Sequence, residues 1–267
     1  MTSWQRVIRN LAMAFAILLA VGIIGGILSV IGVFGFIFDG GDVTQDTKSY
    51  AITQNITDLK VEVGAADFKI INGEKFAVES NLKNLNVDER SGKLIIKEDN
   101  KFRWNNNNIT LTLTIPADFV FEDADIVTGA GQLNVDTLCA NSLRLNLGAG
   151  EVIIGELSAN SQSKIEGGAG AITINGGVLY NLDLDMGVGE LNLTSCLLGD
   201  SELNQGVGQT NLTLTGNKDD YRLDFDKGLG SISVGGQKMS DDSVYGNGQN
   251  KVDIDGGVGE IKVNFSK

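Results

Sequence analysis

The chain has 267 residues, of which 34 are acidic, 21 are basic and none is histidine, so its formal net charge is −13 at pH 7. This acidic balance excludes nucleic-acid binding, which requires a basic surface, and argues against docking on anionic lipid. Without histidine the chain lacks the commonest general base and metal ligand, and its two cysteines are not spaced for a zinc site.

The N-terminal part of the sequence predicts a membrane anchor. Residues 11–38 contain no charged side chain, and this run exceeds the ~20 apolar residues that a helix needs to cross a bilayer. The run continues too far for a cleaved signal peptide, so we expect an uncleaved transmembrane helix in the lipid bilayer. Arg6 and Arg9 precede the run and Asp39 follows it, which predicts a cytoplasmic N-terminus and an extracytoplasmic remainder.

Beyond this segment the sequence is repetitive. Each unit has alternating apolar and polar residues, then Gly–apolar–Gly, then a second alternation, as in LDLDMGVGELNL from Leu182. Successive first glycines are 19, 20, 19, 19, 22 and 29 residues apart, and a degenerate earlier unit begins at Leu59. We expect the paired glycines to be structural corner residues; the pairs are Gly129 and Gly131, Gly148 and Gly150, Gly168 and Gly170, Gly187 and Gly189, Gly206 and Gly208, Gly228 and Gly230, and Gly257 and Gly259.

Alternation on both sides of each glycine pair indicates short strands that meet at a bend, where glycine permits positive φ and close approach of neighbouring backbones. A unit of this length is typical of one coil of a β-solenoid, in which coils stack about 4.8 Å apart and bury one another's apolar faces. A β-propeller would require longer repeats. The predicted fold class is therefore all-β, a single β-solenoid (β-helix) of 19–20-residue coils stacked consecutively, preceded by one N-terminal transmembrane α-helix.

These patterns divide the chain into a cytoplasmic N-terminus (1–10), a transmembrane helix (11–38), a linker into the solenoid (39–57) and an extracytoplasmic β-solenoid (58–267). Residues 236–250 are interpreted as an inserted loop that lengthens the last step. The apolar residue between the glycines is expected to point inward; these residues are Ala130, Ala149, Ala169, Val188, Val207, Leu229 and Val258. Cys139 and Cys196 lie three coils apart, too far for a disulfide, which predicts two free and mostly buried thiols.

The Gly-x-Gly elements do not indicate a nucleotide or metal site. A dinucleotide-binding loop leads from a strand into a helix, whereas each of these leads into a second strand. Calcium-binding β-helices place a fixed aspartate after the glycines, but here that position varies, with Gln132, Glu151 and Ala171 as examples. We therefore expect no cofactor and no built-in metal, and without histidine no Ser/His catalytic group.

Outward-facing positions form two acidic rows in neighbouring coils. Asp183, Glu202, Asp224 and Asp253 stand four residues before the first glycine, and Glu166, Asp185, Asn204, Asp226 and Asp255 stand two residues before it. The rows are either a solvated face that aids solubility or a surface that binds divalent cations weakly. Glycan-active solenoid enzymes also carry carboxylates, but their abundance here singles out no catalytic pair, so we expect a protein that is not an enzyme.

The coils follow a strand that ends in Ile-Pro, in the stretch ITLTLTIPADF at 109–119. With that strand, residues 50–267 resemble the bacterial putative-adhesin domain of unknown function, which includes relatives of cell-envelope-stress membrane proteins of Gram-positive bacteria. The resemblance implies a β-solenoid at the cell surface and supplies no catalytic residues.

We therefore expect a single-pass cell-membrane protein, not catalytic, whose rigid surface contacts a wall polymer, a host molecule or another membrane protein. The loops at 101–108 and 236–250 are candidate contact segments. The alternatives are an accessory protein that regulates an envelope-stress response through another membrane protein, and a glycan-active enzyme. Neighbouring genes would separate the first two functions.

Overall fold

The computed structural model describes residues 43–99 and 109–266, and these residues form a β-solenoid without an α-helix. Within these two ranges no helix is long and apolar enough to cross a membrane. The predicted cytoplasmic segment 1–10, the predicted transmembrane helix 11–38 and the polar loop 101–108 lie outside the described residues. The all-β solenoid predicted from the repeat is confirmed.

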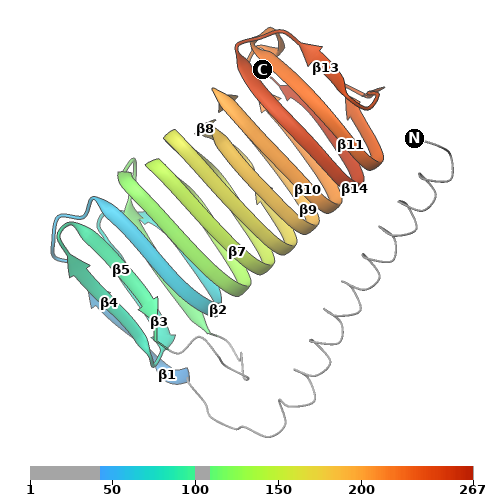
Figure 1. Cartoon of the computed structure of the whole chain (residues 1–267). Helices are drawn as coiled ribbons and strands as arrows, with labels where there is room; N and C mark the ends of the chain where they lie inside the picture. The colour runs from blue at the N-terminus through green and yellow to red at the C-terminus, as the bar shows by residue number, and fades with distance from the viewer. Residues whose placement is uncertain (1–42, 100–108, 267) are drawn as a thin grey trace, which may run out of the picture. The chain divides into compact units, whose positions relative to one another are not determined.

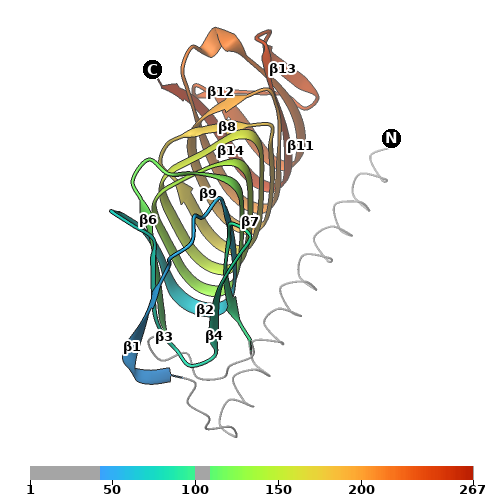
Figure 2. The ribbon, with the colours of Figure 1, turned by 90° about the vertical axis from the view of Figure 1, so that its left-hand side faces the viewer.

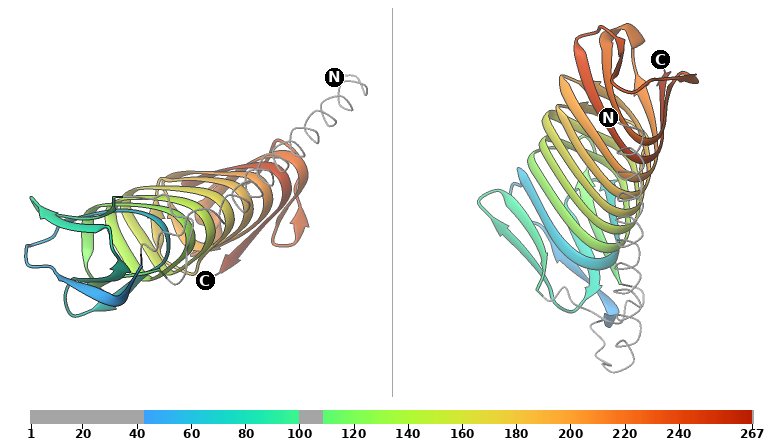
Figure 3. Two further views of the ribbon diagram at one scale, coloured as in Figure 1. Left: turned by 90° about the horizontal axis from the view of Figure 1, so that it is seen from below. Right: turned by 45° about the vertical axis from the view of Figure 1, so that its right-hand side comes forward.

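The coils are built from strands that pair in parallel and in register (Figure 1). The main coil strands are β2 (Asp58–Gly73), β7 (Val120–Ile174), β9 (Leu182–Leu198), β10 (Asp200–Thr215), β11 (Tyr221–Val234) and β14 (Asn250–Ser266). β7 runs without interruption through successive coils, and the short strand β8 (Val178–Tyr180) pairs with both β7 and β9. Both views in Figure 3 show the coils as a stack of similar arches.

The interior of the stack is aliphatic because alternate residues of each strand point inward. In the coil of β9, Leu184 and Leu191 lie on the two sides of the corner, and both are buried. The parallel register places Leu203 beside Leu184, so similar side chains stack from coil to coil. Full burial of a leucine contributes roughly 2 kcal/mol, and the stacked side chains together supply the stability that one coil alone would lack.

The coils do not stack throughout in the order of the chain. β14 follows β11 in the sequence, yet it lies between β10 and β11 and pairs in parallel with both (Figure 1). The corner at Gly257 therefore lies between those at Gly206 and Gly228. The prediction of consecutive stacking is wrong at this end, because coils that share one alternation and one corner fit one another in any order.

Residues 236–250 do more than lengthen the last step. They contain β12 (Gln237–Lys238) and β13 (Ser243–Gly246), which are both antiparallel to β11. They also lead the chain from the outer edge of β11 to the slot that β14 fills, and Asn250 is the first residue of β14. The interpretation as an inserted loop is therefore incomplete, since the segment connects two coils.

Antiparallel strands cover both ends of the stack. At one end β5 (Lys93–Glu98) and β6 (Thr110–Pro116) pair in parallel with the two halves of β2. There, β4 (Leu85–Arg90) pairs with β5, β3 (Ala77–Leu82) with β6, and β1 (Val43–Ala51) with β3, all antiparallel (Figure 2). The segment assigned to a linker, 39–57, thus contains a strand. At the other end β13 and β12 pair with the outer edge of β11 at Arg222–Phe225 and Ser233–Val234, beside a 3-10 helix, η1 (Lys218–Asp220), which limits pairing of these parts of the edge with another chain.

Candidate functional site

The predicted corner glycines form two columns along the stack. From Gly64 and Ala66 of β2, the spatial order of the pairs is Gly129 and Gly131, Gly148 and Gly150, Gly168 and Gly170, Gly187 and Gly189, Gly206 and Gly208, Gly257 and Gly259, then Gly228 and Gly230. The first glycine permits close approach, because a Cβ on Gly187 would lie 2.5 Å from the carbonyl oxygen of Gly168. The second glycine has a positive φ in most pairs, for example +146° at Gly189. A Cβ on Gly189 would also collide with the backbone of Gly170, so the second position requires glycine both for its positive φ and for close approach.

The apolar residue between each pair of glycines points outward. Val188 is 42% exposed, Ala130, Ala149 and Ala169 are exposed, and Val207, Leu229 and Val258 are half-buried. The inward positions on either side, such as Met186 and Leu191, already fill the interior at the corner. The corner residues therefore arch over a filled core, and the prediction that the middle residue points inward is wrong.

Beside the corners the two acidic rows lie as neighbouring ladders, which we call the acidic face. The inner row, nearer the glycines, runs Glu166, Asp185, Asn204, Asp255 and Asp226. The outer row runs Asp183, Glu202, Asp253 and Asp224. Because β14 lies between β10 and β11, it places Asp253 and Asp255 within the rows rather than at their end.

The acidic face lines a shallow, open groove. One hollow of about 700 Å³ follows the inner row, and another of about 450 Å³ reaches Glu202 and Asp224. The two hollows share Asp226 and Asp255. Adjacent coils place neighbouring positions of a row about 4.8 Å apart, and the Asn204 amide interrupts the carboxylates of the inner row between Asp185 and Asp255. The surface is long and flat rather than deeply concave, so it suits an extended partner better than a small molecule.

The outer row is largely neutralised by neighbouring cations. Nitrogen-to-oxygen distances are 2.9 Å for Lys164 and Asp183, 3.1 Å for Arg222 and Asp224, and 2.8 Å for Lys251 and Asp253. In the inner row, Lys164 also lies 3.2 Å from Glu166. Among the described residues, however, no lysine or arginine lies within ion-pair distance of Asp226 or Asp255. The end of the inner row therefore carries negative charge without a cationic partner.

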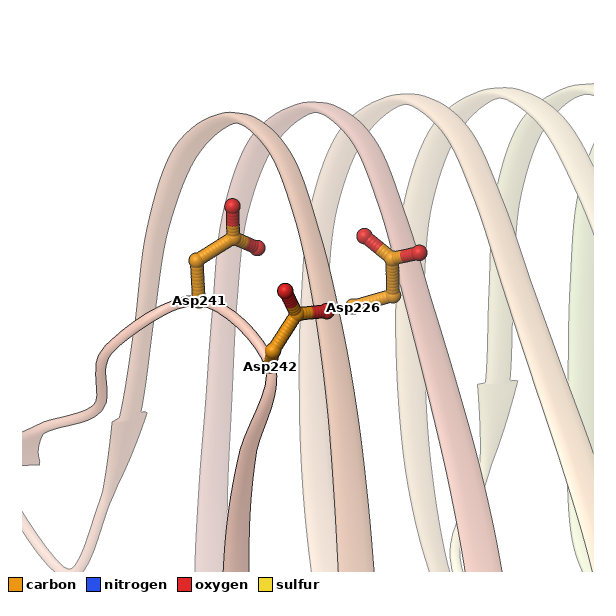
Figure 4. A group of neighbouring side chains, drawn as sticks. All are labelled: Asp226, Asp241 and Asp242. Carbon is orange, nitrogen blue, oxygen red and sulfur yellow. The ribbon is translucent and has the colours of Figure 1, made fainter.

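A loop adds further carboxylates at this point. Asp241 and Asp242 lie between β12 and β13, and carboxylate oxygens of Asp226, Asp241 and Asp242 lie within 4.8 Å of one another (Figure 4). The backbone N–H of Lys227 donates a hydrogen bond of 2.9 Å to the Asp241 carboxylate, which holds the loop against β11. Each of the three aspartates could give one oxygen to a divalent cation, but all three are exposed, which favours weak binding.

The pKa of the Asp255 carboxyl is raised at this place in the groove. Burial raises the pKa of its carboxyl, and the neighbouring carboxylates of Asp226, Glu202 and Asp253 raise the pKa further. A cationic group placed in the groove would counter the same repulsion. The chemistry that the acidic face offers is therefore attraction of positive charge along a line.

The sequence predicted the rows but not the part played by Asp241 and Asp242. Each row recurs at a fixed distance from a glycine corner, which is a periodic signal. Asp241 and Asp242 occur once, in a segment outside the repeat, and their place beside Asp226 depends on how β12 and β13 pair with β11. The chain has no repeated pattern from which that pairing could be inferred.

Cys139 and Cys196 occupy outward-facing positions of their strands, between buried neighbours. Both thiols are free, and both are half-buried rather than mostly buried as expected, because their neighbours in the chain fill the interior instead. Burial raises the pKa of the Cys139 thiol, and the nearby Glu156 carboxylate adds to this shift. A raised pKa keeps a thiol protonated and weakly nucleophilic, so Cys139 is not a candidate nucleophile.

Parallel coils in register with paired glycine corners define an all-β solenoid domain. The profile of the Toastrack DUF4097 family matches residues 53–264, and the chain therefore belongs to this family, a domain family of unknown function. The resemblance to a putative-adhesin domain noted in the sequence is confirmed. No curated protein matches the chain.

Several solved structures match most of this chain at low sequence identity. A putative adhesin from Bacteroides fragilis is 15% identical, with 84% of this chain and 100% of that chain covered and a TM-score of 0.42. A putative adhesin from Parabacteroides distasonis is 13% identical, with coverage of 85% and 98% and a TM-score of 0.45. A putative lipid binding protein from the same species is 15% identical, with coverage of 83% and 96% and a TM-score of 0.38. Similarity at this level supports no inference about a shared ligand.

Proposed function

We propose that this protein is a non-catalytic module of the cell envelope that binds an extended cationic partner along its acidic face. The apolar segment 11–38 would hold it on the membrane with the solenoid outside. The observation that carries the proposal is the inner row, in which Asp226 and Asp255 lie side by side without a cationic partner among the described residues.

The spacing of the face fits a partner with repeated positive charges. Successive coils present carboxylates at intervals of about 4.8 Å, so a polymer or peptide laid across the coils would meet several of them at once. Each exposed contact would contribute little by itself, but linked contacts add through effective concentration. Binding of this kind depends on many equivalent carboxylates rather than on a single residue.

The groove is poorly suited to catalysis. The chain contains no histidine, and the carboxylates of the face are partly or fully exposed in an open hollow rather than held in a closed pocket. Hydrolysis of a glycan by a carboxylate pair would require two residues with distinct environments. In this face the carboxylates repeat in nearly equivalent positions, which supports a binding role.

Binding of the purified full-length chain to immobilised poly-lysine tests the proposal, with poly-glutamate as the negative probe. We expect binding to poly-lysine that weakens steeply with salt, because the contacts are ionic. The triple variant Asp185→Asn, Asp226→Asn, Asp255→Asn should lose at least tenfold in affinity. The matched control Glu74→Gln, Glu156→Gln, Glu190→Gln removes the same charge from exposed positions off the face and should bind nearly as wild type does.

Equal losses in the two triple variants would mean that net charge alone drives binding, and would refute a specific role of the acidic face. Turnover of a cell-wall or host polysaccharide, abolished by one Asp or Glu substitution, would instead support the glycan-active enzyme. Basic peptides from extracytoplasmic segments of membrane proteins, tested beside cationic wall polymers, would separate the accessory role in envelope stress from polymer binding.

A further inference from the structure

The slot between β10 and β11 is filled by a strand that comes later in the chain than both. β10 pairs with β14 from Asp200 beside Lys251 to Thr215 beside Ser266. β11 pairs with the opposite edge of β14, from Tyr221 beside Asn250 to Val234 beside Val263. β10 and β11 do not pair with each other. Without β14, each would therefore present a long row of unpaired backbone groups to the other across an open slot.

The slot is complementary to β14 both at its glycine corner and in its buried side chains. Gly257 of β14 packs against the backbone of Gly206 on one side, and Gly228 packs against Gly257 on the other. Val252 and Ile254 are buried in the core, each beside an inward residue of β10 and β11. A strand that enters this slot therefore needs the alternation and the glycine corner of a coil, which β14 of any copy of this chain has.

The chain reaches the slot through a very short crossover. β13 lies on the outer edge of β11, where Gly246 is beside Arg222, and β14 begins on the inner edge, where Asn250 is beside Tyr221. Residues 247–249 therefore cross over the start of β11. The Gly248 N–H donates a hydrogen bond of 3.1 Å to the Tyr221 carbonyl, and a Cβ on Gly248 would collide with the backbone of Asp220 and Tyr221.

We propose that this slot is a strand-acceptor site that β14 of a second copy can occupy, giving a strand-exchanged dimer. In such a dimer every contact of β14 with β10 and β11 is kept but is made between chains, so exchange loses few contacts. The 247–249 crossover becomes an extended link between the two copies and no longer folds over the start of β11, at the cost of the Gly248–Tyr221 hydrogen bond. Short hinges of this kind favour exchange, because residues that must turn back within one chain can instead extend between two.

Exchange would also alter the acidic face. β14 carries Asp253 and Asp255, which lie within the outer and inner rows. In the exchanged dimer each acidic face is completed by two carboxylates of the partner copy. A dimer would then present two composite faces on linked solenoids, which increases the number of simultaneous contacts with an extended partner.

Substitution of Gly248 tests the proposal in the full-length chain. Gly248→Val makes the closed crossover sterically impossible but leaves β14 and its slot unchanged. Gln249→Val is the matched control, because Gln249 is exposed in the same crossover and already carries a Cβ. Both variants are made in a background with Cys139→Ser and Cys196→Ser.

For each variant two chains with different tags are prepared, one with Asn211→Cys and the other with Lys262→Cys. These positions are chosen because Asn211 in β10 and Lys262 in β14 lie side by side.

The two chains are refolded together and treated with a short bis-maleimide. A cross-link between Cys at 211 and Cys at 262 can then form only if β14 of one chain lies in the slot of the other. We expect Gly248→Val to raise this inter-chain product at least tenfold over Gln249→Val. If Gly248→Val does not refold, Gly248→Ala with its smaller side chain is compared in the same way.

Two results would overturn the proposal. The first is that a single chain with Asn211→Cys, Lys262→Cys and Gly248→Val cross-links within itself as much as the same chain with Gly248 does. This would mean that the closed crossover tolerates the valine side chain. Alternatively, a folded variant could give neither product, which would mean that β14 is released from the slot rather than exchanged.

Discussion

At the scale of single residues, the first glycine of each corner is fixed by the neighbouring backbone. A Cβ at Gly187 would lie 2.5 Å from the Gly168 carbonyl oxygen, far inside van der Waals contact. Gly187→Val should therefore lower the free energy of unfolding by roughly 3 kcal/mol or more, measured by urea denaturation. The control Glu202→Ser changes an exposed residue and should stay within about 0.5 kcal/mol of wild type. Similar losses in both would show that the corner is not closely packed.

We predict that titration of the Asp255 carboxyl makes the free energy of unfolding depend on pH. Its folded-state pKa is raised above the ordinary value of 3.8, so the protonated carboxyl is the form that the fold favours. The associated stabilisation is fully present below pH 3.8 and is lost as pH rises through the folded-state pKa. At pH 7 the charged Asp255 therefore opposes folding, whereas at pH 3 it does not.

Asp255→Asn should accordingly be more stable than wild type at pH 7, by about 0.5 kcal/mol because the groove is open to solvent and screened. The difference should disappear at pH 3 and shrink in 1 M salt. Thermal denaturation at the two pH values measures it. Asp183→Asn is the comparison, since Asp183 is paired with Lys164 at 2.9 Å and its removal should bring no gain at pH 7. A gain for Asp183→Asn equal to that for Asp255→Asn would contradict the distinction between the rows.

At the scale of elements, β2 forms the last glycine corner at one end of the stack, and the Glu98 side chain bonds to that corner where no neighbouring coil does. β5 pairs with β2 as far as Glu62, and β6 begins to pair only at Asp67, so within the described residues no strand lies beside Gly64 on that side. The buried Glu98 carboxylate accepts a hydrogen bond of 2.7 Å from the Gly64 N–H. A side chain thus takes the place of the backbone carbonyl that a neighbouring coil would supply.

Glu98→Ala should therefore lower the free energy of unfolding by about 2 kcal/mol, because a buried N–H is left without its acceptor. Hydrogen exchange should accelerate at Gly64 and along the edge between β2 and β5. Glu98→Gln retains an acceptor oxygen and should recover most of the protection at Gly64. If Glu98→Ala and Glu98→Gln accelerate exchange at Gly64 equally, the hydrogen bond is not what stabilises this corner.

At the scale of the whole molecule, the repeat predicted the architecture because one coil in register determines the next. The inward alternation, the glycine corners and both acidic rows follow from positions relative to Gly187 and its equivalents. The insertion of β14 between β10 and β11 could not be predicted, because β11 and β14 are equally complementary to β10. Likewise, the apolar character of Val188 predicts an inward side chain, whereas its actual direction depends on how much volume Met186 and Leu191 leave at the corner.

At the same scale, we propose that residues 11–38 cross the membrane and predict the orientation of the chain. Residues 11–38 carry no charge, Arg6 and Arg9 precede them, and the acidic solenoid follows them. We expect the positive flank to stay in the cytoplasm and the solenoid to be exported. In a background with Cys139→Ser and Cys196→Ser, single cysteines at Lys238, which is exposed in β12, and at Ser3 report the two sides.

A membrane-impermeant maleimide added to intact protoplasts should label Lys238→Cys fully and Ser3→Cys only after lysis. The chain should also sediment with membranes and be released by detergent but not by high salt, because an inserted helix is held by apolar contacts rather than by charge. Replacing Arg6 and Arg9 with Glu should reduce labelling of Lys238→Cys in intact protoplasts, since the charge difference across the segment is then lost. Labelling of Ser3→Cys before lysis, or release of the chain by salt alone, would contradict this topology.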